Sequence, residues 1–150
     1  MPTVAAVTGH ASAGGCLLAL CHDYRIMRGD RGVLYMSEVD LGLPLRPYFM
    51  AVLRAKITAA DALRDVVLRG KRVRAAEGKQ MGIVDAVYPS VDETAAEALK
   101  FAEQLAARKW DGGVYASIRM SMYPEACRSV GIVEESDEEK RKRKYFASKL

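Results

Sequence analysis

The sequence predicts one α/β domain with a layer of parallel strands and a mostly helical carboxyl-terminal part. The chain has 150 residues, of which 50% are apolar and 28% charged, so it contains enough apolar material for one soluble core. Short β-branched runs alternate with helical patterns up to about residue 90, an order typical of parallel α/β layers. Beyond that point only helical patterns follow.

Each strand is predicted from a short apolar run that a glycine, a proline or a charged turn ends. The predicted strands are residues 3–8, 24–27, 33–35 and 83–88, with a short extended piece at 72–73. Residues 9–15 and 36–47 are predicted as loops, because glycine, proline and small residues dominate them.

Helices are predicted where apolar residues recur at helical spacing, most clearly over 91–108. The predicted helices are residues 16–21, 48–55, 59–68, 75–81, 91–108 and 114–130, the last interrupted near Pro124. The helix at 16–21 is apolar on nearly every side, so we expect it to be buried.

Charge and cysteine patterns argue against several classes of protein. No stretch approaches the ~20 apolar residues that a membrane span requires. The net charge is +4, but the dense basic run at 140–144 directly follows an acidic run at 134–139, which indicates a solvated helical tail and no nucleic-acid partner. Cys16, Cys21 and Cys127 lack the spacing of zinc ligands, so we predict no metal site and a reducing compartment.

The first feature that suggests chemistry is a small-residue loop that leads from the first strand into a helix near Gly14. The N-terminus of a helix presents unpaired N–H groups and the positive end of its dipole, which suit a phosphate or a developing oxyanion. However, Ser12-Ala13-Gly14-Gly15 is not a GxGxxG motif and has no Walker lysine. Taken alone, close packing of the helix explains the loop better.

The second feature is a pair of acids, Glu38 and Asp40, within the otherwise apolar stretch 37–43. A carboxyl group held among apolar side chains has its charged form disfavoured, which makes it a usable proton carrier near neutral pH. Taken in isolation, two ordinary loop acids are the more common explanation.

Together these segments resemble the central signature of the crotonase (enoyl-CoA hydratase/isomerase) superfamily, and within it the plant-type Δ3-Δ2-enoyl-CoA isomerases. The similar segments are 2–11 (PTVAAVTGHA), 13–16 (AGGC) with Leu18, Ala19 and Asp23, 38–43 (EVDLGL), 70–73 (GKRV) with 75–77 (AAE), and 81–87 (MGIVDAV). The resemblance covers roughly residues 2–89, and as an ordered combination it is fairly specific.

The resemblance implies a crotonase-like ββα-type fold, N-terminally truncated, over residues 1–133. Residues 1–90 would hold the core signature and 91–133 the helical carboxyl-terminal part. Family members have strand–helix units before the position of Met1, and one of those loops supplies a second oxyanion N–H. We therefore expect the first strand to have an open edge and this chain to supply one oxyanion donor.

The family pattern also implies roles for single residues. Hydratases of the family carry two catalytic glutamates, one on the helix after the glycines and one in the segment that matches 37–42. Leu17 stands at the first of these positions and Glu38 at the second. Hydration needs a carboxylate pair, whereas one base can move a double bond. The resemblance therefore implies Glu38 as proton shuttle and the Gly14 N–H as oxyanion donor, with Ala13, Gly14 and Leu17 against the substrate.

The implied reaction is isomerisation of an acyl-CoA thioester, from 3-enoyl-CoA to 2-trans-enoyl-CoA, in fatty-acid β-oxidation. It needs no metal or redox cofactor, because coenzyme A is part of the substrate. Two alternatives stay open: an enoyl-CoA hydratase or other crotonase reaction such as thioester hydrolysis, and a catalytically silent acyl-CoA-binding or subunit-interaction protein. The family usually forms trimers or hexamers, so a homo-oligomer is a possible assembly. The basic cluster of Arg69, Lys71, Arg72 and Arg74 is better explained as a solvated loop than as a CoA-phosphate site.

The chain ends in Ser148-Lys149-Leu150, a tripeptide that the peroxisomal import receptor reads when the terminus is exposed. The charged segment 134–150 carries this tripeptide, which favours an exposed terminus. The sequence therefore predicts a peroxisomal protein with the import receptor as a partner.

Overall fold

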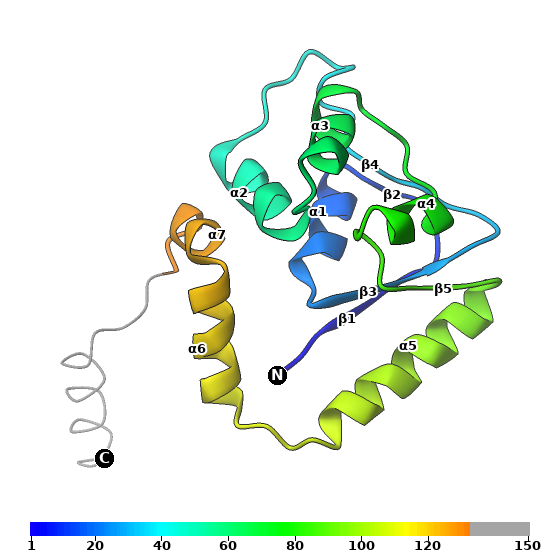
Figure 1. Cartoon of the computed structure of the whole chain (residues 1–150), viewed down its shortest axis with the longest axis vertical. Coiled ribbons are helices and arrows are strands. Elements are labelled where there is room, and N and C mark those ends of the chain that lie inside the picture. Colours follow the sequence, from blue (N-terminus) through cyan, green and yellow to red (C-terminus); the bar gives the residue numbers. More distant parts are fainter. Residues whose placement is uncertain (133–150) are drawn as a thin grey trace.

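A three-stranded parallel sheet lies at the centre of the computed structural model, which describes residues 1–132 (Figure 1). Its strands are β1 (Val4–Val7), β3 (Tyr24–Arg28) and β5 (Ala86–Tyr88), in the order β1-β3-β5. The register pairs Val4 with Tyr24 and Ile26 with Ala86. Since β1 pairs on one side alone within the described residues, the expected open edge of the first strand is confirmed. The charged tail 134–150 and the tripeptide Ser148–Leu150 lie outside the described residues.

A second, smaller sheet joins residues 11–12 to residues 34–35. Strand β2 (Ala11–Ser12) runs parallel to β4 (Leu34–Tyr35), with Ser12 opposite Tyr35. Val73 adds an antiparallel bridge to Leu34, with N–H···O distances of 2.9 Å in both directions. The prediction of a loop throughout 9–15 was wrong at β2. Two residues carry no periodicity, and their pairing is set by a partner more than twenty positions away.

Seven helices surround the sheets within residues 1–132. They are α1 (Gly14–Cys21), α2 (Pro47–Lys56), α3 (Ala60–Leu68), α4 (Ala75–Gln80), α5 (Val91–Ala106), α6 (Gly112–Met122) and α7 (Pro124–Ser129). Helix α5 packs across all three strands of the larger sheet, and α1–α4 lie on the other side (Figure 1). The predicted α/β layer is therefore confirmed.

Local signals explain where several helices begin and end. The side chain of Ser90 accepts a hydrogen bond from the Glu93 N–H at 3.2 Å and caps the start of α5. Asp111 caps α6 in the same way, through the N–H of Val114 at 2.8 Å. The interruption expected near Pro124 is confirmed, because α6 ends at Met122 and α7 begins at the proline.

Helix α1 is only half buried, which corrects the expectation of a fully buried helix. Leu20 is inaccessible and joins the core with Cys16 and Leu17, whereas Leu18 is 66% exposed and Cys21 is exposed as well. A helix that is apolar all round has no pattern to indicate which side will pack. Of the helices within residues 1–132, none combines the length and hydropathy of a membrane span.

The predicted strand 83–88 is shorter than expected. Gly82 has a φ of +70° and ends the turn after α4, where Ile83 and Val84 both donate their N–H groups to the carbonyl of Gly78. These two side chains are buried, but their backbone closes a turn, so pairing with β3 begins only at Ala86. The apolar composition of Ile83 and Val84 therefore predicted their burial correctly, but the strand predicted for them was wrong.

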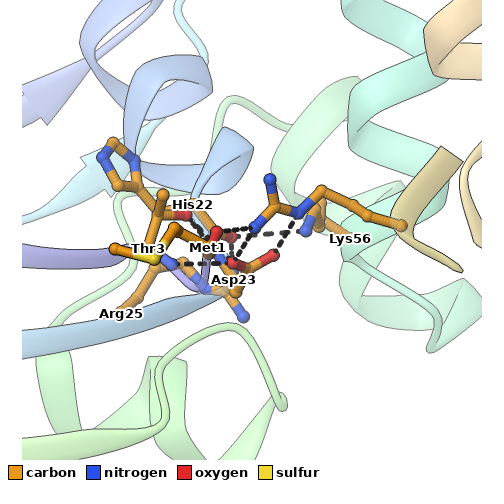
Figure 2. Close-up of polar contacts among 7 residues, drawn as sticks. Met1, Thr3, His22, Asp23, Arg25 and Lys56 are labelled. Carbon is orange, nitrogen blue, oxygen red and sulfur yellow. Dashed lines mark hydrogen bonds and ion pairs between the residues drawn. The ribbon is translucent and has the colours of Figure 1, made fainter. Parts of the chain in front are cut away.

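Asp23 joins segments that are far apart in the sequence. Its carboxylate accepts the N–H of Thr3 at 2.8 Å and the guanidinium of Arg119, at 2.9 Å from Nε and 2.5 Å from the terminal nitrogen. Arg119 also donates to the carbonyl of Met1 at 2.6 Å. Figure 2 shows Met1, Thr3 and Asp23 converging on this junction, through which α6 is attached to the start of the sheet.

Candidate active site

The site begins at the turn that starts helix α1. Ala13, the residue before the helix, has a φ of +46°, a region that disfavours residues with a Cβ atom. Its N–H donates to the carbonyl of Tyr35 at 2.9 Å, and its carbonyl accepts the N–H of Leu17 at 3.0 Å. These bonds hold the strained residue from both sides.

The N–H groups of the first helical turn have no partner within their own helix. Gly14 is the first residue of α1 and is exposed, and a Cβ atom added there would meet nothing within 4 Å. A ligand therefore has free access to the backbone at Gly14. The positive end of the helix dipole lies at the same place and favours a partial negative charge on that ligand.

The pairing of β2 with β4 brings Glu38 toward this turn. Tyr35 lies opposite Ser12, so the segment after Tyr35 leaves the small sheet at the same end as the segment that enters α1. A short turn then fixes the backbone of Glu38, whose carbonyl accepts the N–H of Leu43 at 2.9 Å. Gly42, with a φ of +67°, gives this turn its shape.

Glu38 and Asp40 point to different environments, although they are two residues apart. Glu38 Oε2 is buried and has no hydrogen-bond partner among the described residues. Asp40 is exposed and packs against the turn at Gly70, where its Oδ2 would lie 2.9 Å from an added Cβ atom. An unpartnered buried carboxylate oxygen is unusual in a native fold and is expected where a ligand or a proton has to be held.

Cys16 lies close enough to Glu38 to respond to its charge. Burial, together with the negative charge of Glu38, raises the pKa of the Cys16 thiol to about 12, and a hydrogen bond with the Tyr35 backbone acts in the opposite direction. The thiol therefore stays protonated at neutral pH and is a poor nucleophile. Because Cys16 belongs to the first turn of α1, the charge of Glu38 acts on that turn.

Leu17 supplies an apolar wall at this turn. Its side chain is 6% exposed and belongs to the main core. Helix α1 itself carries no acidic residue, so Glu38 has no carboxylate partner on this helix.

The hollows in residues 1–132 differ in how near they lie to these residues. A groove of about 570 Å³ follows the open edge of β1 and reaches Ala11, Ser12 and Gly15, which flank the Ala13–Gly14 turn. A second, apolar cleft of about 560 Å³ lies between α6 and the start of β3 and includes neither Glu38 nor the turn. Of the two, the groove beside β1 is the one that reaches the turn.

The sequence identified Ala13, Gly14, Leu17 and Glu38, which the structure brings to one end of the small sheet. Sequence reasoning missed Tyr35, whose carbonyl anchors the strained Ala13, because backbone acceptors leave no mark in the side-chain pattern. Within residues 1–132, no group of three or more His, Cys, Asp or Glu side chains is close enough to hold a metal ion.

Comparison with known proteins matches residues 1–130 to the enoyl-CoA hydratase/isomerase family. The chain is 53% identical over 133 residues to enoyl-CoA delta isomerase 2, peroxisomal, from Arabidopsis thaliana, covering 88% of this chain and 55% of that protein. It is 50% identical over 133 residues to enoyl-CoA delta isomerase 3 from the same plant, covering 88% and 56%. The crystal structure of human mitochondrial Δ3-Δ2-enoyl-CoA isomerase is 32% identical, with a TM-score of 0.74 over 85% of this chain and 48% of that one.

The chain therefore spans about half the length of these curated relatives. The matched region, residues 1–130, includes both the glycine turn at α1 and the segment of Glu38. With a family match over most of its length and a shared fold, the chain belongs to the enoyl-CoA hydratase/isomerase family.

Proposed function

We propose that this protein is an enoyl-CoA isomerase that converts 3-enoyl-CoA thioesters to 2-trans-enoyl-CoA in fatty-acid β-oxidation. The observation that carries the proposal is the buried Oε2 of Glu38, which has no partner among residues 1–132 and lies beside a helix without acids. The names of the plant relatives support the same reaction class. The reaction is a redox-neutral rearrangement of the substrate, so its balance requires neither an oxidant nor a metal.

The thioester carbonyl oxygen accepts a hydrogen bond from the Gly14 N–H at the start of α1. Glu38 removes a proton from C2, and the electron pair of the broken C–H bond moves toward the thioester to give a dienolate. The helix N-terminus stabilises the negative charge on the oxygen; a single donor of this kind contributes about 2.7–4 kcal/mol in well-studied enzymes. Glu38 then delivers the proton to C4, which moves the double bond from C3–C4 to C2–C3.

Leu17 determines which reaction Glu38 can support. Hydration of a double bond needs one group to activate water and another to move a proton, whereas α1 carries the apolar Leu17 and no acidic residue after its glycines. An apolar wall also keeps water away from the dienolate. The arrangement therefore favours isomerisation over hydration or thioester hydrolysis.

The test is to compare Glu38→Gln with Asp40→Asn in a spectrophotometric assay of 3-enoyl-CoA conversion. Both variants remove one carboxylate from the same loop, but only Glu38 is turned inward. We expect the Glu38 variant to lose at least about 10²–10⁴-fold in kcat, the usual contribution of a general base, while acyl-CoA binding stays nearly unchanged. The Asp40 variant should retain near-normal kcat. Near-normal rates in the Glu38 variant would show that another group is the base.

The same preparations test the other activities. Water addition to 2-enoyl-CoA would identify a hydratase, and release of free CoA would identify a thioester hydrolase. Acyl-CoA binding without turnover of either substrate would identify a silent binding protein.

We also propose that the protein is peroxisomal and that the import receptor binds its terminal tripeptide, Ser148–Leu150. The support is the tripeptide itself and the word peroxisomal in the names of plant relatives. Deletion of the tripeptide from a fluorescent fusion should leave the protein in the cytosol, and unchanged import would refute the signal. A homo-oligomer, as a trimer or hexamer, is proposed on the exposed apolar side chains of α6, and light scattering measures it.

A further inference from the structure

Within the basic cluster after α3, the charged side chains differ in their partners. Arg69 and Lys71 are ion-paired: Arg69 lies 3.3 Å from Asp65, and Lys71 lies 2.6 Å from Glu77. Arg72 and Arg74 are exposed and have no carboxylate within 4.0 Å among residues 1–132. The cluster therefore consists of two ion-paired cations beside two cations that have no carboxylate partner among residues 1–132.

Arg72 is held in place by an aromatic ring. Its guanidinium carbon lies 5.3 Å from the centre of the Tyr35 ring, within the range of a cation–π contact. The backbone explains the contact: the antiparallel bridge between Leu34 and Val73 sets Arg72 beside Tyr35. Leu34 and Val73 turn into the core, so their strand neighbours Tyr35 and Arg72 point to the opposite face.

The same register connects Arg72 to the candidate active site. Ser12 pairs with Tyr35, and Arg72 lies on the far side of Tyr35, so the three residues form one row across adjacent strands. With strands about 4.8 Å apart, the backbone of Arg72 is roughly 10 Å from that of Ser12, two residues before Gly14. A ligand can therefore extend across this small sheet, with its thioester at Gly14 and an anionic group at Arg72.

We propose that Arg72, supported on the Tyr35 ring, binds a phosphate group in the coenzyme A part of the substrate. A planar guanidinium recognises phosphate with two parallel hydrogen bonds, and stacking on an aromatic ring orders it before the ligand arrives. The inference rests on the proposed acyl-CoA isomerase function. It replaces the expectation of a uniformly solvated basic loop with one specific contact residue.

The experiment measures dissociation constants by calorimetry for two probes, octanoyl-CoA and octanoyl-pantetheine. The probes share the acyl chain and the thioester, but the second lacks the nucleotide phosphates. We expect Arg72→Gln to weaken octanoyl-CoA binding about tenfold, at the low end for a charge-assisted contact that is open to solvent, and to leave octanoyl-pantetheine binding unchanged. Arg72→Lys should give an intermediate loss, because a lysine keeps the charge but not the paired geometry.

Arg69→Gln is the matched control, since it removes a cation of the same loop that is ion-paired with Asp65. It should leave the binding of both probes unchanged, and thermal melts show whether each variant is folded. An unaltered affinity of Arg72→Gln for octanoyl-CoA, or an equal loss for both probes, would overturn the contact. Failure of the unmodified protein to bind either probe would instead overturn the proposed function itself.

Discussion

The junction at Asp23 gives the sharpest test of how the fold is held together. Asp23→Asn removes the charge that receives two hydrogen bonds from Arg119 and keeps the size of the side chain. The two side chains are 12% and 31% exposed, so solvent screens this pair less than an ordinary surface pair. Hydrogen bonds to charged groups contribute about 1.5–3 kcal/mol, and we expect a loss of about 2 kcal/mol in the free energy of unfolding.

The loss should depend on pH in a defined direction. Burial alone raises the pKa of Asp23, but hydrogen bonds from Arg119 and Thr3 and the charge of Arg119 outweigh it, so the pKa lies below its ordinary value of 3.8. A carboxyl group with a lowered pKa stabilises the fold fully above its unfolded value and loses this contribution as the pH falls through its folded value. The difference between the variant and the unmodified protein should therefore be constant from about pH 5 to 8 and shrink below about pH 4.

Thermal melts followed by circular dichroism measure the effect. For a chain of this size, about 2 kcal/mol corresponds to a fall of about 4–8 °C in Tm. The control is Asp30→Asn, which breaks a similar two-bond contact with Arg28 that is local and exposed, so its Tm should change little. An unchanged Tm for Asp23→Asn, or a deficit that persists at pH 2, would refute the reasoning.

Two further predictions concern the backbone and the thiols. Gly32→Ala should lower the free energy of unfolding by at least about 2 kcal/mol. The reason is that φ at this position is +106° and the new Cβ would lie 2.6 Å from the Gly9 carbonyl oxygen. Urea titration measures the change, and an unchanged free energy of unfolding would contradict the prediction. A thiol reagent at pH 8 should modify the exposed Cys21 in the folded protein but should react with Cys16 only after unfolding. Cys16 is protected because its thiol is buried and has a pKa of about 12. Rapid modification of Cys16 in the folded protein would contradict its burial.

Much of this architecture could be predicted because its signals are local. Helix α5 follows from the Ser90 cap and a regular apolar spacing, and the break between α6 and α7 follows from Pro124. Strand β2 could not be predicted, because its two residues are strands only through pairing with β4. The exposed side of α1 could not be predicted either, because Leu18 is as apolar as its buried neighbours and only its position in the fold exposes it.

For the candidate site too, the sequence predicted which residues take part but not how they are oriented. A resemblance carried by Gly14, Leu17 and Glu38 indicated the residues, but composition could not say which acid of the loop turns inward. That choice is made by the turn between Glu38 and Leu43, whose geometry depends on Gly42 in a left-handed conformation. The contact between Arg72 and Tyr35 depends on the register of strands distant in the sequence, so the basic residues looked alike until that register was known.

The path of the proton from C2 to C4 can be followed with a deuterium label through one turnover. The substrate is a 3-enoyl-CoA with two deuterium atoms at C2, incubated in ordinary water, and the product is weighed by mass spectrometry at low conversion. If Glu38 carries the proton from C2 to C4 through its buried oxygen, a measurable fraction of the product retains both deuterium atoms, one of them at C4. A product that has always lost one deuterium to water would contradict a single carboxylate shielded from solvent.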